Sequence, residues 1–346
     1  MPRWRRLVRR LNVLLIQLKR IGDLILTVPA IAALREKFPS AKITLVVAHG
    51  SRELLPAIQG VDHAVVMRGG VSDLPRWLAI ARTGFDYCFD FSRTDRSAFL
   101  SLLSCAQHRV TYTSAPHELL REFCYNEVVP SRVQTLHTID HHLALLDSLG
   151  INEPRPEIGL ALPDAAQKRA AEIIETRNLG EDFVVLHVGS ARAEKFWLAE
   201  RWAEVIDRLR DQFTFVLTSG SSPLELEQIA KIKSQLRAPV VDLAGELDLL
   251  TLAALIARAR LLVTIDSAPM HLAGALGTPQ VALFGPTNPF HWRPRTTPAL
   301  ILQGEKASSG EDFAPKQPPA AMNEISTEQV IDAMQSLLST PAARES

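Results

Sequence analysis

The sequence predicts an α/β protein made of two Rossmann-like domains. Three observations lead to this prediction: short β-rich runs alternate with longer helical patterns, the alternation is interrupted once by a proline-containing stretch and then restarts, and the 346 residues suffice for two domains. Strands that alternate with helices form βαβ units, so the sheets are expected to be mostly parallel. With 47% hydrophobic residues, each domain can form its own core.

The first domain is expected over residues 1–155. Its predicted strands are mostly apolar runs near residues 13–18, 42–47, 64–67, 87–91 and 109–112. The helical patterns among them lie near residues 24–38, 74–81, 95–104 and 137–149. The stretch INEPRPEIGLALPD, residues 151–164, has three prolines and no long period, which is typical of a linker.

The second domain is expected over residues 164–340. Its predicted strands lie near residues 183–188, 213–218, 240–243, 261–265 and 280–284. Its predicted helices lie near residues 165–176, 201–211, 223–236, 249–259 and 270–276. Residues 286–323 are rich in Pro, Ser, Lys and Gly and are expected to form a long loop, ordered or partly disordered. A last helix is expected over residues 326–338, with Ser326 or Thr327 as its N-cap.

Composition and charge narrow the range of possible functions. Lys and Arg together number 38, as do Asp and Glu, so the chain is neutral overall and no nucleic-acid partner is expected. Three cysteines without a C-x-x-C pair are typical of free thiols in a reducing cytosol. Cys88 and Cys105 stand in apolar segments, so both are expected to be buried.

The basic N-terminus does not have the pattern of an export signal. Its apolar run is short and is closed by charged residues, and no run in the chain reaches the roughly 18 apolar residues of a membrane helix. We therefore expect a cytoplasmic protein. Trp4, Leu7, Val8 and Leu11 recur at helical spacing among five arginines. This pattern fits an interfacial helix on an anionic membrane or, equally, a frayed basic leader.

The common nucleotide-binding motifs are missing from the sequence. There is no G-x-G-x-x-G after a predicted strand, no G-x-x-x-x-G-K-[ST], and no D-x-D pair that would hold a divalent ion. These absences disfavour a dinucleotide oxidoreductase, a P-loop NTPase and a metal-dependent sugar transferase. What remains is a two-domain protein that handles a diphosphate with helix N-termini and cationic side chains.

Two stretches of the second half fit that task. In LHVGSARAEKFWLAERW, residues 186–202, a strand ends before Gly189 and Ser190, and Lys195 supplies a positive charge; the alternative is an ordinary loop with a solvated lysine. In VTIDSAPMHLAGALGTPQVALFGPTNP, residues 263–289, a strand ends in Asp266 and a helix of small residues follows. His271 on that helix is either a ligand for hydroxyls or phosphate, or a satisfied core histidine.

The third stretch is LKRIGDLILTVPA, residues 18–30, where Gly22 and Asp23 stand between the first strand and the first helix. Two interpretations of Asp23 remain open. As a helix N-cap it would contribute about 1 kcal/mol to stability. As a general base it would contribute about 10²–10⁴ to the reaction rate.

Together these stretches resemble glycosyltransferase family 9, the ADP-heptose:lipopolysaccharide heptosyltransferases. The resemblance extends from about residue 12 to about residue 338. Its most specific parts are RIGDLILTVPAIAALREKFPSAKITLVV at residues 20–47 and the block at 263–289 with its HWRP continuation. FDYCFDFSRTDRSAFLSLL at residues 85–103 and HTIDHHLALLDSLGI at residues 137–151 also match segments typical of the family.

The resemblance implies a GT-B fold, in which an N-terminal acceptor-binding domain and a C-terminal donor-binding domain face an interdomain cleft. It implies inverting, metal-independent transfer of a heptose from an ADP-heptose-like nucleotide sugar to an inner-core lipopolysaccharide sugar, with no cofactor. The basic leader would then keep the enzyme near its lipid-borne acceptor, peripherally on the cytoplasmic face of the inner membrane.

The resemblance also assigns roles to residues of this chain. The family's catalytic aspartate falls on Asp23, which would take the proton of the acceptor hydroxyl. Its donor-binding residues fall on Ser190, Lys195, Glu225, Leu247, Asp266, Ser267 and His271. Glu227 is an alternative to Glu225, and Leu247 would line the base pocket through its backbone. Lys19, Arg20 and Arg96 are candidates for binding the acidic acceptor; the alternative is solvated surface.

Three rival functions stay open at this point. The chain could be a GT-B transferase with another nucleotide-sugar donor or with a protein acceptor, which donor-dependent release of ADP, UDP or GDP would separate. It could bind nucleotide sugars without turnover. A dehydrogenase is the most distant rival, and saturable NADH binding would favour it.

Overall fold

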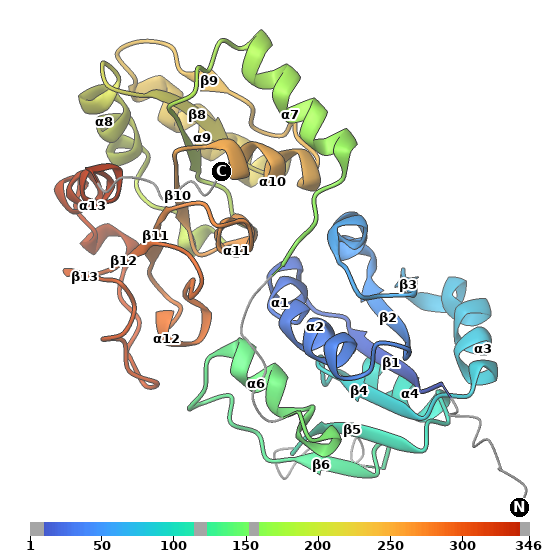
Figure 1. The fold of residues 1–346 in the computed structure, drawn as a ribbon. Coiled ribbons are helices and arrows are strands. Elements are labelled where there is room, and N and C mark those ends of the chain that lie inside the picture. The colour runs from blue at the N-terminus through green and yellow to red at the C-terminus, as the bar shows by residue number, and fades with distance from the viewer. Residues whose placement is uncertain (1–9, 114–122, 152–158, 340–346) are drawn as a thin grey trace, which may run out of the picture. The chain divides into compact units, whose positions relative to one another are not determined.

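The computed structural model describes residues 10–113, 123–151 and 159–339 (Figure 1). The chain divides into two compact units. The first comprises residues 1–132 and 139–156, and the second comprises residues 133–138 and 157–346. The basic N-terminal segment with Trp4, Leu7 and Val8 lies outside the described residues.

The first unit contains one six-stranded parallel sheet with the order β3-β2-β1-β4-β5-β6. Its strands are β1 (Asn12–Gln17), β2 (Lys42–Ala48), β3 (His63–Met67), β4 (Tyr87–Asp90), β5 (His108–Tyr112) and β6 (Glu127–Val129). Its helices are α1 (Ile21–Ile25), α2 (Val28–Lys37), η1 (His49–Ala57), η2 (Gly70–Asp73), α3 (Leu74–Thr83), α4 (Asp95–Leu103), α6 (Thr138–Ala144) and η4 (Asp147–Leu149).

The second unit contains a seven-stranded sheet with the order β13-β12-β11-β10-β7-β8-β9. Its strands are β7 (Phe183–His187), β8 (Thr214–Thr218), β9 (Val241–Asp242), β10 (Leu261–Ile265), β11 (Gln280–Phe284), β12 (Ala299–Gln303) and the antiparallel edge strand β13 (Lys306–Ser308). Its helices are α7 (Asp164–Thr176), η5 (Ala193–Lys195), α8 (Ala199–Leu209), α9 (Pro223–Gln235), α10 (Leu249–Arg258), α11 (Ala268–Leu276), α12 (Pro289–Trp292), η6 (Met322–Glu324) and α13 (Thr327–Ser339).

Each sheet has a topological switch point. In the first unit the chain grows from β1 to β2 and β3, then returns to the other side of β1 with β4; in the second unit it grows from β7 to β8 and β9, then returns beside β7 with β10. Open parallel sheets bind ligands beyond the carboxyl ends of the two strands at such a point. The loops after β1 and β4, and those after β7 and β10, are therefore the places to look for function.

The central strands are buried on both faces, as parallel sheets covered by helices require. Val13, Leu14, Leu15 and Ile16 of β1 are at most 1% exposed. All five residues of β7 and all five of β10 are buried as well. The near-continuous apolar runs that predicted these strands reflect this two-sided burial.

The expected helix over residues 24–38 is in fact two helices. α1 ends at Ile25 and α2 begins at Val28, with Pro29 in the first turn of α2. Proline has no N–H to donate to the carbonyl four residues earlier, and its ring crowds that carbonyl, so one continuous helix cannot form across this position. The prediction missed the break, which separates the short helix carrying Asp23 from the rest.

The predicted loop over residues 286–323 contains α12, β12 and β13, so the expectation of one long loop, ordered or partly disordered, was wrong. β12 pairs in parallel with β11 over Gln280–Phe284, and its residues are almost all buried. β6 was also missed. The last helix is confirmed, and Ser326 is its cap: its hydroxyl accepts from the Gln329 N–H at 3.2 Å while the Gln329 side chain accepts from the Ser326 N–H at 2.8 Å.

The three cysteines are free, as predicted, but only one of the two expected core cysteines is buried. Cys88 lies on β4 with no exposed surface. Cys105 is exposed in the turn after α4, where its φ of 49° is in the left-handed region. The apolar segment that suggested burial ends before it. None of the helices in the described part of the chain is both long and apolar enough to span a bilayer.

Candidate active site

Asp23 follows β1 at the switch point of the first unit. Arg20 is the N-cap of α1, and Asp23 is the third residue of the helix, so the interpretation of Asp23 as the N-cap is wrong. The side chain is half-buried. Burial raises the pKa of Asp23, against the charge of Lys19 and the backbone N–H and charge of Arg20. A carboxylate with a raised pKa that still reaches solvent is suited to accept a proton.

A buried hydrogen-bond network holds the backbone around Asp23. The Thr27 hydroxyl donates to the Asp23 carbonyl at 2.8 Å and accepts from the Gln17 side-chain amide at 2.9 Å. His142 Nδ1 lies 3.2 Å from both the Thr27 hydroxyl and the Leu26 carbonyl. Because Leu26 offers only an acceptor, the network assigns the proton of neutral His142 to Nδ1. Burial lowers the pKa of His142 to about 3, so this ring stays neutral near pH 7.

The same network reaches the end of β4, the other strand at the switch point. The Ser92 hydroxyl accepts from the Leu18 N–H at 2.5 Å, and the Gln17 side-chain carbonyl accepts from the Lys19 N–H at 3.2 Å. The turn that leads from β1 into α1 is therefore fixed from both sides. Thr27, Ser92 and His142 each lie in a segment that matches the family, at residues 20–47, 85–103 and 137–151, but their contacts were not predicted.

The candidate acceptor-binding residues divide into two groups. Lys19 and Arg20 are exposed in the loop immediately before Asp23. Arg96 is half-buried on α4, beside Gly69 of the loop after β3. The pKa of Asp73 lies below its usual range. The backbone N–H groups of Arg68 and Gly69 lower it most, followed by the charge of Arg76 and then by that of Arg96. Lys19 and Arg20 are thus the cations next to Asp23.

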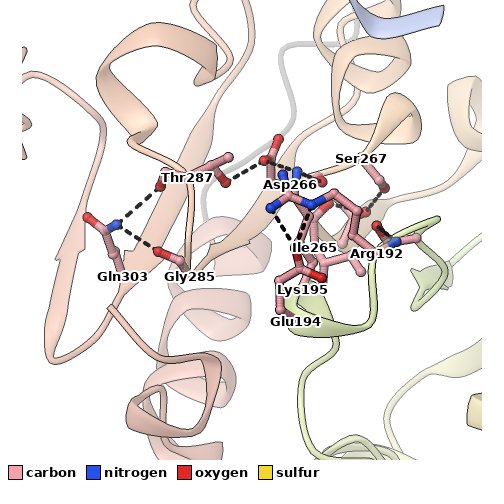
Figure 2. Close-up of polar contacts among 11 residues, drawn as sticks. Arg192, Glu194, Lys195, Ile265, Asp266, Ser267, Gly285, Thr287 and Gln303 are labelled. Carbon is pink, nitrogen blue, oxygen red and sulfur yellow. Dashed lines mark hydrogen bonds and ion pairs between the residues drawn. The ribbon is translucent and has the colours of Figure 1, made fainter. Parts of the chain in front are cut away.

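Lys195 and Asp266 meet at the switch point of the second unit (Figure 2). Lys195 follows β7, Asp266 follows β10, and the two strands are neighbours in the sheet. The Lys195 ammonium lies 2.5 Å from the Asp266 carboxylate and also donates to the Asp266 carbonyl at 3.0 Å. The two residues are 9% and 7% exposed. A buried ion pair of this kind is strongly coupled, because removing one partner leaves the other charge without compensation.

Two further residues complete this cluster, and the sequence did not single them out. The Thr287 hydroxyl donates to the same carboxylate oxygen of Asp266 at 2.5 Å. The Gln303 side-chain amide donates to the carbonyls of Gly285 and Thr287, each at 3.2 Å (Figure 2). Thr287 lies inside the quoted block at residues 263–289. Gln303 could not be found, because β12, whose last residue it is, was not predicted.

His271 is buried on the first turns of α11, next to the ion pair. Burial lowers its pKa to about 4; the Asp266 carboxylate opposes this shift and the Lys195 charge adds to it. The imidazole is therefore neutral near pH 7 and can both donate and accept a hydrogen bond. The structure brings His271 together with Lys195 and Asp266, as a ligand-binding role requires.

Ser190 and Ser267 occupy the loops on either side of Lys195 and Asp266. The Ser190 hydroxyl accepts from the Arg192 N–H at 3.2 Å and is half-exposed. Ser267 is the N-cap residue of α11, but its side chain makes no capping hydrogen bond, and its hydroxyl lies 3.5 Å from that of Thr264. The start of α11 contributes the partial positive charge of a helix N-terminus to this edge.

The structure separates Glu225 from its alternative, Glu227. Ser222 is the N-cap of α9: its hydroxyl accepts from the Glu225 N–H at 3.4 Å and donates to the Glu225 carboxylate at 2.7 Å. The same carboxylate accepts from the Gly220 N–H at 3.1 Å. A Cβ atom at Gly189 would lie 2.4 Å from this carboxylate, so Glu225 reaches the loop that carries Ser190. Glu227 is exposed and pairs with Lys231 at 2.7 Å. Only Glu225 lies at the carboxyl edge with the other candidates.

Leu247 lies in the turn between β9 and α10. It is half-buried, and its side chain packs on one of the unit's apolar clusters. The preceding Gly245 donates its N–H to the Ser219 carbonyl at 3.1 Å, which joins this turn to the loop after β8. Across residues 10–113, 123–151 and 159–339, no group of three or more His, Cys, Asp or Glu side chains is arranged to hold a metal ion.

Comparison with known proteins identifies the family. Residues 77–317 match the profile of glycosyltransferase family 9 (heptosyltransferase). The chain belongs to this family. It is a glycosyltransferase with the GT-B fold, as the sequence predicted. It is 27% identical over 285 residues to lipopolysaccharide heptosyltransferase 3 of Escherichia coli, covering 79% of this chain and 83% of that protein.

Solved structures agree in fold. A family 9 glycosyltransferase from Veillonella parvula superposes with a TM-score of 0.82 at 26% identity, covering 94% of this chain and 97% of that one. The E. coli heptosyltransferase WaaC, solved with ADP-2-deoxy-2-fluoro heptose, superposes with a TM-score of 0.69 at 19% identity, covering 94% of this chain and 99% of that one. These likenesses extend over both units.

Proposed function

We propose that this glycosyltransferase transfers a heptose from an ADP-heptose-like nucleotide sugar to a sugar of the lipopolysaccharide core, with inversion at the anomeric carbon and without a metal ion. The names of its relatives support the acceptor, and the ligand of WaaC supports the donor. The observation that carries the proposal is the buried Lys195–Asp266 pair at the switch point of the second unit. It supplies a fixed cation where a diphosphate would be held.

The second unit would bind the donor. Lys195, the Ser190 hydroxyl and the N-terminus of α11 would stabilise the negative charge that grows on the departing diphosphate. Asp266 keeps the Lys195 ammonium in place before the donor arrives, so little reorganisation is needed when charge develops. His271, which is neutral, would hydrogen-bond a sugar hydroxyl or a phosphate oxygen. Glu225 and the Leu247 backbone would bind the nucleoside end.

The first unit would bind and activate the acceptor. Asp23 would take the proton from the attacking hydroxyl as the new C–O bond forms at the anomeric carbon and the bond to the diphosphate breaks. Because the pKa of Asp23 is raised, activity should fall on acidification at a higher pH than the usual pKa of an aspartate. Above that pH the ionised form of Asp23, which acts as the base, dominates. Lys19 and Arg20 would bind acidic groups of the core, and the enzyme would work at the cytoplasmic face of the inner membrane.

The test is a product analysis. The enzyme is incubated with ADP-, UDP- and GDP-linked sugars and with defined truncated core lipids or acceptor proteins, in excess EDTA, and the products are weighed. We expect a mass increase of one heptose on a core lipid with ADP-heptose alone. Transfer from a UDP- or GDP-sugar, or to a protein, would replace the proposed substrates. Donor binding with no product from any acceptor would indicate a binding protein, and loss of transfer in EDTA would contradict the metal-free mechanism.

A further inference from the structure

One face of the first unit carries apolar side chains that point to solvent. Five residues of η2, α3 and α4 form what we call the α3–α4 patch: Val71, Leu74, Leu78, Phe99 and Leu102, which are 92%, 53%, 42%, 46% and 45% exposed. The half-buried ring of Trp77 joins the two helices, because it contacts the Phe99 ring edge-to-face with centroids 5.5 Å apart. The patch is thus one surface across two helices.

The helical spacing explains why the patch is not part of the core. Leu74, Trp77 and Leu78 stand at i, i+3 and i+4 of α3, and Phe99 and Leu102 stand at i and i+3 of α4. The core-facing sides of the same helices are occupied by other residues, Ile80 and Leu100, which are at most 2% exposed. Each helix therefore has an apolar side left over. Such contiguous exposed apolar surface is typical of a binding site.

The charge around the patch is positive. Residues 68–103 contain five arginines and no lysine, namely Arg68, Arg76, Arg82, Arg93 and Arg96. Among the described residues, the exposed Arg68 and Arg82 make no ion pair.

The acidic groups of the same stretch offset only part of this charge. Asp73 pairs with Arg76 at 3.5 Å, and Asp90 has no exposed surface. Asp86 accepts from the Asn12 N–H at 2.8 Å, and Asp95 is the exposed carboxylate of the stretch.

The exposed Arg68 and Arg82 stand three residues before Val71 and four residues after Leu78, next to the patch in sequence. An apolar surface with arginines beside it is complementary to a membrane, which is apolar inside and anionic at its surface.

We propose that the α3–α4 patch docks this enzyme on an anionic membrane, with the apolar side chains entering the interface and the arginines binding lipid phosphates. A second copy of the chain fits less well, because a two-fold contact would place arginines against arginines. α3 and α4 follow β3 and β4, so both begin at the carboxyl edge where Asp23 lies. The biological reason rests on the proposed function, since that acceptor is carried on a lipid.

The test is vesicle binding by the full-length enzyme without donor or acceptor. Phosphatidylglycerol–phosphatidylcholine vesicles are compared with pure phosphatidylcholine in a sedimentation assay. We expect binding to the anionic vesicles that weakens with salt. Leu78→Asp and Phe99→Asp should each lower the partition coefficient about tenfold, because each withdraws a large apolar side chain from the interface. Leu224→Asp on α9, 38% exposed in the wild type, is the matched control and should change nothing.

Variants that change charge test the docking proposal independently of the apolar substitutions. Arg82→Glu should weaken binding to anionic vesicles and leave the weak binding to phosphatidylcholine unchanged, whereas Arg169→Glu on α7 should do neither. Circular dichroism melting checks that each variant is folded. A paired substitution of Arg5 and Arg6 by Gln tests the basic N-terminal segment as the rival contact.

Two results would overturn the docking proposal. One is unchanged vesicle binding by both Leu78→Asp and Phe99→Asp, with or without loss in the Arg5/Arg6 variant. The other is a change of molecular mass in solution in these variants without a change in vesicle binding, which would assign the patch to a second copy. Transfer to a delipidated core sugar separates this proposal from the proposed function: the patch variants should keep wild-type activity there, whereas failure of the proposed function abolishes transfer in every variant.

Discussion

The two units have the same strand order around their switch points, but the carboxylates at these points have different electrostatic surroundings. In the second unit the carboxylate after the returning strand, Asp266, is buried and neutralised by Lys195 at 2.5 Å. In the first unit Asp23 makes no ion pair with any described residue, and burial raises its pKa. A paired carboxylate holds its cationic partner in place, whereas an unpaired carboxylate with a raised pKa is suited to accept a proton. The same topology thus provides a binding edge in one unit and a candidate base in the other.

Among the substitutions that test this difference between the two units, the largest effect is expected at Lys195. Lys195→Met leaves Asp266 as an uncompensated buried charge, so the free energy of unfolding should fall by about 3–5 kcal/mol, and donor affinity should fall with it. Urea denaturation and donor titration measure the two effects. Arg169→Met, which removes an exposed pair with Glu172, is the control and should cost less than about 1 kcal/mol.

A double variant sharpens the result. Lys195→Met with Asp266→Asn removes both charges and should recover most of the lost stability without recovering donor binding. If the double variant binds donor like the wild type, the ion pair has a structural role alone.

A smaller effect is expected where the loops of the second unit approach each other. Gly189→Ala would place a Cβ atom 2.4 Å from the Glu225 carboxylate and 3.0 Å from the Ser219 side chain. We expect a loss of about 1–3 kcal/mol in the free energy of unfolding, because the Glu225 carboxylate must move away and Ser219, whose Cα lies 3.1 Å from the added carbon, must yield slightly. Gly50→Ala is the control, because no atom lies within 4 Å of the added carbon. Equal stability of the two variants would show that this approach is looser than described.

The network behind Asp23 should affect turnover more than binding. Thr27→Val removes the hydroxyl that joins Gln17, His142 and the Asp23 carbonyl, and we expect kcat to fall about tenfold with donor affinity unchanged. Thr83→Val removes an equivalent hydroxyl bond, to the Ala79 carbonyl at 2.7 Å, in the last turn of α3 and serves as the control. Thr27→Ser should restore kcat. A loss of stability alone, without rescue of kcat by serine, would mean that Thr27 does not position Asp23.

Both units should respond to acid in the same direction. Burial lowers the pKa of five histidines, to about 3 for His137 and His142 and to about 4 for His141, His187 and His271. Between those values and about pH 6.5 the unfolded chain binds more protons than the folded one, so stability falls as the pH is lowered. The raised pKa values of Asp23 and Asp90 act in the opposite sense. Urea midpoints should decrease from about pH 7 to about pH 5, and a constant midpoint would contradict the burial of these rings.

Sequence reasoning found most of the fold because the central strands are two-sided apolar runs and the helices between them are long. It failed where structure is set by partners far along the chain. β12 is a short run in a proline-rich segment and becomes a strand because β11 offers it a parallel edge. The break between α1 and α2 was readable from Pro29, and the prediction overlooked it.

The candidate site likewise contains residues that the sequence predicts and residues that it does not. Asp266 directly follows β10, His271 lies on the first turns of α11 and Lys195 lies in the segment that follows β7, and the structure brings these three together. Thr287 and Gln303 join them only through pairing of β10, β11 and β12, which local pattern does not reveal. The hydrogen bond between Thr27 and His142 likewise depends on the packing of α6, more than a hundred residues away in sequence.

The most direct test of the account is the single-turnover rate of Asp23→Asn at saturating donor and acceptor, measured by rapid quench. Asparagine keeps the shape of the side chain but cannot take up the proton. We predict a rate lower than that of the wild type by about 10²–10⁴, with the donor dissociation constant unchanged in the same preparation. A rate close to that of the wild type would contradict the assignment of Asp23 as the base, and with it the division of roles between the two switch points.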